Sequence, residues 1–403
     1  MQNPFIKRLV PNLIPGIACM LLMCQAYLVV PLQPTLTKEF NSLLLNMAIP
    51  AFIIPFAIAG IVMGFCRHSI KPEQSFLISL VIMSAGTLLL STVTSAGVFL
   101  LIRVLTGLGT GLMLPLALIL VTKYGDKRGW LANMVTMIFA LATGVTFGPG
   151  LGGWLNGLFG WRLLYLTISI IVAVLLLFYF LSKKQGRDDQ HHAIKLPGAS
   201  NLVKRNKYIY TFAYLTGVFH SGVFVWISNY FATHYVLDEF NTANALSILG
   251  VPGLITAIFM FCYKLDKKVI KILYAGFALT FAGIIILATD VPLFFAQCLL
   301  VLISVGFSCT QPLFIGILKM PARQWYAVRP IAIGSGILFA GYGSGPLIMI
   351  ALPGTGPTIA ICFFAGLIIA MCIVSQQIWK TPQQQRRHSA SAKSRGKDHL
   401  INA

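Results

Sequence analysis

The sequence of 403 residues is 57% hydrophobic and only 10% charged, a composition that excludes an ordinary soluble domain and is typical of a polytopic membrane protein. The formal net charge of +20 comes from lysines and arginines that lie almost entirely outside the apolar runs. Such a distribution follows membrane topology and attracts anionic lipid, so it does not imply nucleic-acid binding.

The apolar runs are long enough for helices that cross a bilayer, whose core of about 30 Å takes roughly 20 helical residues. The first run follows Lys7 and Arg8, is too long for the apolar part of a signal peptide and lacks a small-residue cleavage site, so we predict an uncleaved first helix. We predict an all-α fold with twelve spans near residues 12–32, 43–65, 74–92, 97–122, 130–156, 162–182, 208–232, 242–263, 270–289, 292–318, 328–351 and 356–379.

The basic residues predict the orientation of these spans, because lysine and arginine accumulate in cytoplasmic loops. With the N-terminus placed inside, only Lys38 and Arg162 fall on the outer side, and only Arg103 lies within a span. We therefore expect a multi-pass protein of the inner (plasma) membrane with both termini in the cytoplasm.

One long polar loop, residues 183–207, divides the spans into two groups of six. His191 and His192 in this loop have no further ligand set around them, so a solvated linker explains them better than a metal site does, and we predict no metal and no cofactor. The predicted domains are a cytoplasmic N-terminus (1–11), a first six-helix bundle (12–182), the linker (183–207), a second six-helix bundle (208–379) and a basic disordered tail (380–403).

Landmarks recur between the two halves at a nearly constant offset. The segment "GVTFGP" at 144–149 has a counterpart in "GYGSGP" at 341–346, an offset of 197 residues. Phe65 and Cys66 match Phe261 and Cys262 in the second half, and Gly107 matches Gly306. Three matches in order, at corresponding spans, predict two pseudo-symmetric bundles of six helices.

The segment "ATGVTFGPGLGGW" at 142–154 places three glycines four residues apart on one helix face, where missing side chains let another helix approach closely. A proline within it bends the helix. Two interpretations stay open, a kinked and tightly packed helix or a sliding or rocking contact between the halves. The residues assigned to gating or helix packing are Gly107, Gly109, Gly144, Gly148, Pro149, Gly152, Gly153, Gly341, Gly345 and Pro346.

Charged and titratable groups within the spans are candidates for function, because burying a charge in the membrane is costly. Arg103 could bind a carboxylate or a phosphate, and the alternative is an arginine capped by backbone carbonyls or extended toward the interface. All ten acidic residues fall in loops, termini or span edges, which disfavours a cationic substrate. His220 is the natural proton carrier, and its alternative is a hydrogen bond to a neighbouring helix.

Three motifs resemble those of the major facilitator superfamily, and in particular its twelve-span drug:proton antiporter branch. "GVTFGPGLGG" is similar to the antiporter signature of the fifth helix. "LIRVLTGLGTG" at 101–111 resembles the fourth-helix motif, and "GWRLLY" at 160–165 resembles the start of the sixth helix. The resemblance implies the major facilitator fold, in which the first, fourth, seventh and tenth helices line a central cavity. The substrate and coupling candidates on those helices are Gln25, Tyr27, Arg103, His220 and Gln311.

The loop after the second span departs from the family pattern. It offers Gly60, Gly64 and the basic Arg67, but no aspartate at the matching place, and the second half has only a partial echo at Asp266. A gating ion pair is therefore not expected in the first half.

We predict a secondary active transporter, not an enzyme, that exports a small organic molecule, anionic or neutral rather than cationic, by alternating access and with a proton as the coupling ion. The alternatives are an uptake symporter or facilitator for an organic anion, such as a carboxylate metabolite or a siderophore, and a non-transporting membrane sensor or membrane enzyme. The expected partners are the substrate, the proton and the lipid bilayer, without nucleic acid, and the family precedent favours a monomer.

Overall fold

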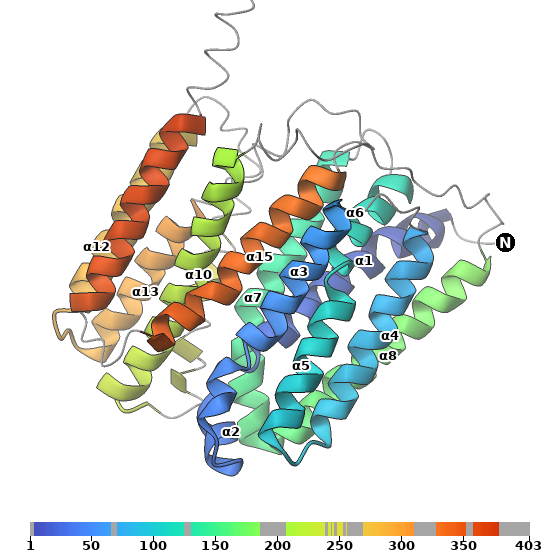
Figure 1. The fold of residues 1–403 in the computed structure, drawn as a ribbon, viewed down its shortest axis with the longest axis horizontal. Coiled ribbons are helices and arrows are strands. Elements are labelled where there is room, and N and C mark those ends of the chain that lie inside the picture. The colour runs from blue at the N-terminus through green and yellow to red at the C-terminus, as the bar shows by residue number, and fades with distance from the viewer. Residues whose placement is uncertain are drawn as a thin grey trace, which may run out of the picture.

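The computed structural model describes residues 4–65, 71–124, 130–185, 207–237, 241–242, 244–245, 248–252, 255, 269–309, 328–351 and 358–378. Within these segments the chain forms helices and short connections, without a strand (Figure 1). Seven helices of the described part are long and apolar enough to cross a membrane, and three shorter apolar helices accompany them. The prediction of an all-helical membrane protein is confirmed.

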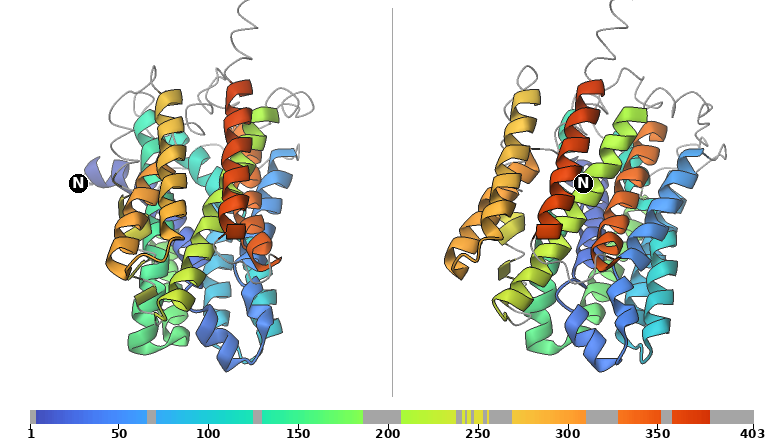
Figure 2. Two further views of the ribbon diagram at one scale, coloured as in Figure 1. Left: turned by 90° about the vertical axis from the view of Figure 1, so that its left-hand side faces the viewer. Right: turned by 60° about the vertical axis from the view of Figure 1, so that its left-hand side comes forward.

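The elements follow the predicted spans closely, with differences at their ends. The first half contains α1 (Pro4–Tyr27), α2 (Gln33–Glu39), the 3-10 helix η1 (Leu43–Met47), α3 (Pro50–Phe65), α4 (Pro72–Ser91), α5 (Ala96–Thr110), α6 (Met113–Tyr124), α7 (Trp130–Phe159) and α8 (Trp161–Gln185). The second half contains α10 (Lys207–His234), α12 (Val269–Leu287), α13 (Leu293–Ser308), α15 (Val328–Ala351) and a last helix, Thr358–Ile378. The last helix packs on α10 through Phe364, which contacts Phe219 and Trp226 (Figure 2).

Three predicted spans differ from single regular helices. The first ends at Tyr27 and continues to Leu32 as turns, so the expected span of 12–32 is too long at its end. The second begins as the 3-10 helix η1 and continues as α3 after a turn at Ala48 and Ile49. The fourth is broken into α5 and α6 at Gly111 and Leu112, although it still crosses as one apolar segment. A methyl group on Gly111 would lie 2.4 Å from the Phe56 carbonyl oxygen, so the broken turn packs directly on α3.

The glycine faces of the two halves pack in the same way. A methyl group on Gly144 of α7 would lie 2.2 Å from the Met20 carbonyl oxygen of α1. Its counterpart, Gly341 of α15, would place a methyl group 2.2 Å from the Tyr214 carbonyl oxygen of α10. Since each contact joins the fifth span of a half to its first span, the repeat predicted from the sequence is visible in the packing.

The hypothesis that the α7 glycines form a sliding contact between the halves is wrong for this structure. Gly148 faces Cys24 and Gly152 faces Leu28, so the face packs on α1 within the first half. Pro149 lies inside α7, and Gly153 is buried. The contact of α7 with the second half uses another face, where Thr146 lies against Gly250.

The structure does not support the match of Gly107 with Gly306. Gly107 packs against the Phe52 carbonyl of α3, whereas Gly306 packs against Gly276 and Thr280 of α12, so these two glycines do not occupy corresponding contacts. Gly109 packs on Ile82 of α4. The match of Phe65–Cys66 with Phe261–Cys262 lies largely outside the described residues, as do most of the linker and the tail.

The extended contact between the halves is the pair α3 and α15, which the sequence did not single out. Gly60 lies against Gly336, Gly64 against Ile333, and Gly343 against Ile54. Gly60 and Gly64 thus belong to the last turns of α3 and pack across the halves. Gly336 and Gly343 are seven residues apart, which places them on one face of α15, distinct from the face of Gly341 and Gly345.

Candidate substrate and coupling site

Arg103 is fully buried and hydrogen-bonded to main-chain carbonyls. Its Nε donates to the Ala48 oxygen at 3.0 Å, and its two Nη atoms donate to the Gln25 and Ala26 oxygens at 3.0 and 3.2 Å. The guanidinium carbon lies 4.9 Å from the centre of the Phe52 ring. The geometry is that of the capping alternative left open by the sequence.

Arg103 binds main-chain carbonyls at the ends of two helices, where no helical N–H group is available to pair with them. Gln25 and Ala26 are the two residues before Tyr27, the last residue of α1, and Ala48 caps the C-terminus of η1. The last carbonyls of a helix have no partner within the helix, and a cation is favourable there. Arg103 therefore joins the end of α1 to the end of η1.

His220 of α10 forms a polar pair with Tyr342 of α15. Its Nδ1 lies 2.7 Å from the Tyr342 hydroxyl oxygen, and the tautomer of the imidazole decides which atom is the donor. The imidazole stacks on Phe307 of α13 with ring centres 3.3 Å apart, and it is 2% exposed. His220 and its two partners thus join three helices of the second half. Histidine is the side chain whose ordinary pKa lies nearest neutral pH.

Tyr27, the last residue of α1, extends from the first half to this pair. Its ring makes edge contacts with Tyr342 at 6.2 Å and with Phe224 at 5.9 Å between centres. Its hydroxyl is buried and has no hydrogen-bond partner among the residues that the structure describes. A buried hydroxyl of this kind costs free energy unless a water or a ligand pairs with it.

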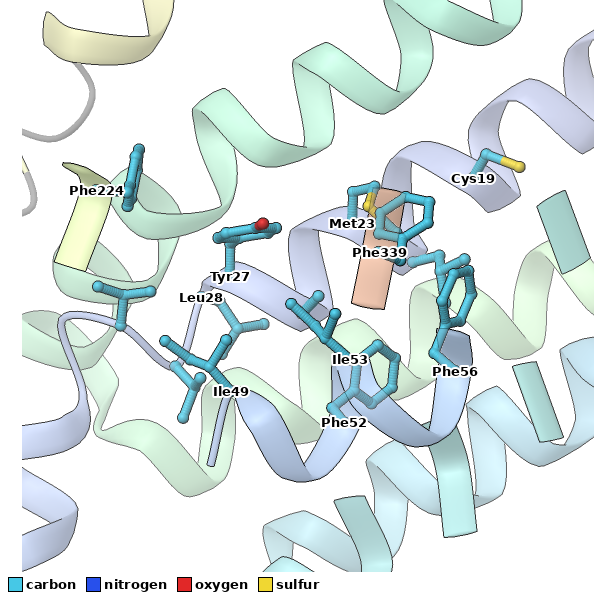
Figure 3. Close-up of a cluster of buried hydrophobic side chains, with 14 of the residues drawn as sticks. Cys19, Met23, Tyr27, Leu28, Ile49, Phe52, Ile53, Phe56, Phe224 and Phe339 are labelled. Carbon is cyan, nitrogen blue, oxygen red and sulfur yellow. The ribbon is translucent and has the colours of Figure 1, made fainter. Parts of the chain in front are cut away.

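The surrounding side chains complete an aromatic cluster, defined here as Tyr27, Phe56, Phe224, Phe339 and Tyr342. Phe56 of α3 meets Phe339 of α15 at 4.9 Å, and Phe339 lies 5.7 Å from Tyr342. Figure 3 shows Tyr27 and Phe56 of the first half converging with Phe224 and Phe339 of the second. The cluster is thus built across the boundary between the two halves.

Gln25 is placed apart from this cluster. Its side chain is fully buried and both its amide atoms lack a hydrogen-bond partner. Two residues along a helix turn by about 200°, so Gln25 and Tyr27 lie on opposite faces of α1. The structure therefore brings Tyr27 and His220 together but not Gln25 or Arg103. The candidates Gln311, Arg67 and Asp266 lie outside the described residues and stay predictions.

The acidic residues of the described part all lie at helix ends. They are Glu39 at the end of α2, Glu73 in the first turn of α4 and Asp290 between α12 and α13. Glu39 accepts hydrogen bonds from Trp161 Nε1 at 2.6 Å and from Arg162 Nη1. Burial raises the pKa of Glu39, but these hydrogen bonds and the Arg162 charge outweigh it and hold the pKa below its usual value of 4.5.

Comparison with solved structures supports the architecture. The chain superposes on the D-xylose-proton symporter with a TM-score of 0.69 at 14% identity, covering 90% of this chain and 96% of that one. It superposes equally well on the human organic anion transporter MFSD10 (TETRAN), with a TM-score of 0.69 at 14% identity, covering 93% and 100% of the two chains. At this identity the likeness concerns the fold alone.

Curated relatives match over shorter segments. The probable multidrug resistance protein EmrY of Escherichia coli is 30% identical over 159 residues, which are 38% of this chain and 30% of that protein. The putative multidrug resistance protein MdtD of Klebsiella pneumoniae is 24% identical over 143 residues, 35% of this chain and 30% of that one. The chain thus spans about a third of the length of these relatives in the matched regions.

The sequence profile of the Major Facilitator Superfamily matches residues 16–346, most of the chain. The match includes the fourth-, fifth- and sixth-helix motifs, and it agrees with the two packed glycine faces and with the superposed folds. Members of this family are membrane transporters rather than enzymes. The chain belongs to the Major Facilitator Superfamily and is a multi-pass protein of the plasma membrane.

Proposed function

We propose that this transporter exports small organic molecules, anionic or neutral rather than cationic, in exchange for protons. The observation that carries the proposal is the buried group of Tyr27, His220 and Tyr342, which combines a titratable side chain with an aromatic surface supplied by both halves. The names of the relatives EmrY and MdtD support export, since both are described as multidrug resistance proteins.

The charge preference rests on the acidic residues. Within the described spans no carboxylate lies away from a helix end, so those spans offer no fixed negative charge to a cation. Aromatic rings with a few polar groups suit a largely apolar organic molecule. The unpartnered Tyr27 hydroxyl is available to hydrogen-bond one polar group of such a substrate.

Proton coupling is assigned to the His220–Tyr342 pair. Neutral His220 stacks on Phe307 in an apolar setting, and a proton on the imidazole would place a charge there. Among the described residues, the titratable group that contacts it is the hydroxyl of Tyr342, whose ring in turn contacts Tyr27. Protonation therefore favours a conformation in which the halves separate and water reaches the imidazole.

Alternating access uses the α3–α15 contact. Glycines at this boundary bring the helix backbones close, with few side chains to interlock. We expect the halves to rock at this contact while the α1–α7 and α10–α15 pairs move as units. We further propose that both termini are cytoplasmic and that the transporter works as a monomer.

The test is a proteoliposome flux assay with anionic, neutral and cationic aromatic compounds, with a pH gradient imposed in either direction. Proton-driven counterflow of anionic or neutral compounds supports the proposal. Movement of substrate and proton in the same direction would instead identify uptake by symport. Preferential transport of cations would contradict the charge assignment.

A further inference from the structure

A cavity of about 250 Å³ opens between the halves at the end of the helices where α2 lies. The first half supplies Gln33 of α2, Asn46 of η1 and Ile49, which precedes α3. The second half supplies Val225 and Asn229 of α10 with Pro346 and Ile350 of α15. In the proposed orientation this is the outer side of the membrane.

The lining of this cavity has a definite chemistry. Three carboxamides, those of Gln33, Asn46 and Asn229, each carry two donors and an acceptor. Gln33 Nε2 donates to the Asn46 main-chain oxygen at 3.3 Å, which orients one carboxamide beside another. Among the described residues that line the cavity, the other side chains are apolar and none is charged.

The cavity is separate from the His220 site. Asn229 is nine residues beyond His220 along α10, about 13 Å at a rise of 1.5 Å per residue. Phe224 lies between the two levels along α10, and Tyr27 contacts both Phe224 and Tyr342, the partner of His220. A molecule in the cavity would therefore be divided from His220 by aromatic rings.

We propose that this cavity is an outer binding site for neutral molecules that combine an apolar body with one hydrogen-bonding group. The carboxamides pair with that group, and Ile49, Val225, Pro346 and Ile350 cover the body. The absence of charge among the lining residues disfavours ions, which would lose hydration without a compensating partner. Because both halves form the walls, the site changes shape whenever the halves rock. The inference rests on the proposed function only for the statement that exported molecules pass through it.

Three flat probes of nearly equal shape test the site, namely benzamide, benzoate and benzamidinium, which are neutral, negative and positive. Their affinities are measured by saturation-transfer NMR titration on the full-length protein in lipid nanodiscs. We expect benzamide to bind more tightly than either ion. Asn229→Leu should weaken benzamide by about fivefold, the effect of one lost hydrogen bond.

The matched control on the same helix is Thr233→Val. Thr233 lies one turn beyond Asn229, and its hydroxyl donates to the Asn229 main-chain oxygen at 2.7 Å without lining the cavity. This variant should bind benzamide as the parent does.

A variant that gains affinity for another probe must be folded, so it tests the site even if Asn229→Leu fails to fold. Asn229→Asp keeps the side-chain shape and adds one negative charge, so it should reverse the preference from benzamide to benzamidinium. Absence of benzamide binding to the parent, equal binding of benzoate, or an unchanged preference in Asn229→Asp would each overturn the site. Binding is measured without a gradient, so a failed flux assay with intact binding would reject the exporter and leave the site standing.

Discussion

The α1–α7 and α10–α15 helix pairs have the same packing but different chemistry. In each pair a glycine of the later helix lies against a main-chain carbonyl of the earlier one, at 2.2 Å from an added methyl group in both cases. The earlier helices then diverge. α1 stops at Tyr27, where Arg103 caps its carbonyls, whereas α10 continues unbroken to His234 and carries His220 in its interior.

The two halves share their close helix contacts but differ in the polar side chains that lie near those contacts. Close helix contacts depend on main-chain geometry, so glycines at those contacts stay similar in both halves. Arg103 keeps its proton at any physiological pH, whereas a histidine can exchange one. The first half therefore supplies a fixed joint and the second half the group suited to proton coupling.

The largest expected effect comes from filling the shared glycine contacts. Gly144→Leu and Gly341→Leu would each drive a side chain into a main-chain carbonyl, which cannot rotate away, so the helix pair must separate. Overpacking usually costs about 1–3 kcal/mol, and a backbone clash in a helix pair lies at the upper end. We expect both variants to lose flux and to melt well below the parent in nanodiscs.

The control for this prediction is Gly157→Leu in the last turn of α7, where an added methyl group meets no described residue within 4 Å. It should behave as the parent does. If Gly144→Leu were damaging and Gly341→Leu harmless, the two pairs would not be equivalent scaffolds.

The next effect concerns Arg103. Arg103→Ala would leave the carbonyls of Gln25, Ala26 and Ala48 without their donors, and an unpaired buried polar group costs about 1–3 kcal/mol. We expect lower thermal stability together with loss of flux, measured by melting and by proteoliposome transport. Arg103→Lys keeps the charge but loses the planar fork, so it should restore little.

Recovery of flux by Arg103→Lys would indicate that charge alone matters at this position. A parent-like melting temperature for Arg103→Ala would contradict the capping role.

A smaller effect is expected at the titratable pair. Tyr342→Phe removes the 2.7 Å partner of His220 and should lower gradient-driven flux by about fivefold, and His220→Gln should flatten its dependence on pH. The matched control is Tyr214→Phe, which removes another α10–α15 hydrogen bond, from the Tyr214 hydroxyl to Ser344 at 3.1 Å. An unchanged pH profile in His220→Gln would assign coupling to another group.

Much of the fold was predictable because apolar length and glycine spacing act locally. Hydropathy located the spans, and the offset between Gly144 and Gly341 located the repeat. Spacing shows that a helix face is small, but it does not show which helix lies against it. For that reason the α7 face was open to two interpretations, and the contact of Gly336 and Gly343 with α3 was missed.

The site was less predictable because its partners are main-chain atoms or distant side chains. Arg103 was recognisable as a buried charge, but its acceptors exist only because α1 ends near Tyr27. Tyr342, the partner of His220, stands 122 residues away between two glycines, where the glycine pattern drew attention from it. An aromatic residue placed between two glycines of a predicted helix, as Tyr342 is, is the sequence signal that could have indicated the His220–Tyr342 pair.

The smallest expected effect is at the end of the first half where α2 lies and Glu39 joins Trp161 and Arg162. The pKa of Glu39 is lowered in the folded protein, so the carboxylate stabilises the fold at pH values above its ordinary 4.5 and this contribution is lost as the pH falls through the lowered pKa. The ion pair is partly exposed, at 44% for Arg162 and 36% for Glu39, so its worth is about 0–1 kcal/mol.

Glu39→Gln should therefore lower the melting temperature slightly at about pH 7, and the difference from the parent should shrink as the pH approaches about 4. Arg162→Gln should cost more, because Arg162 also donates to the Val93 carbonyl at 3.2 Å and would leave that acceptor without its partner. The double variant should cost less than the two single losses together, since both remove the same ion pair. If the effect of Glu39→Gln did not depend on pH, the charge of Glu39 would contribute nothing to stability. The glutamine oxygen can still accept the hydrogen bond from Trp161, so that bond alone would not reveal the loss of charge.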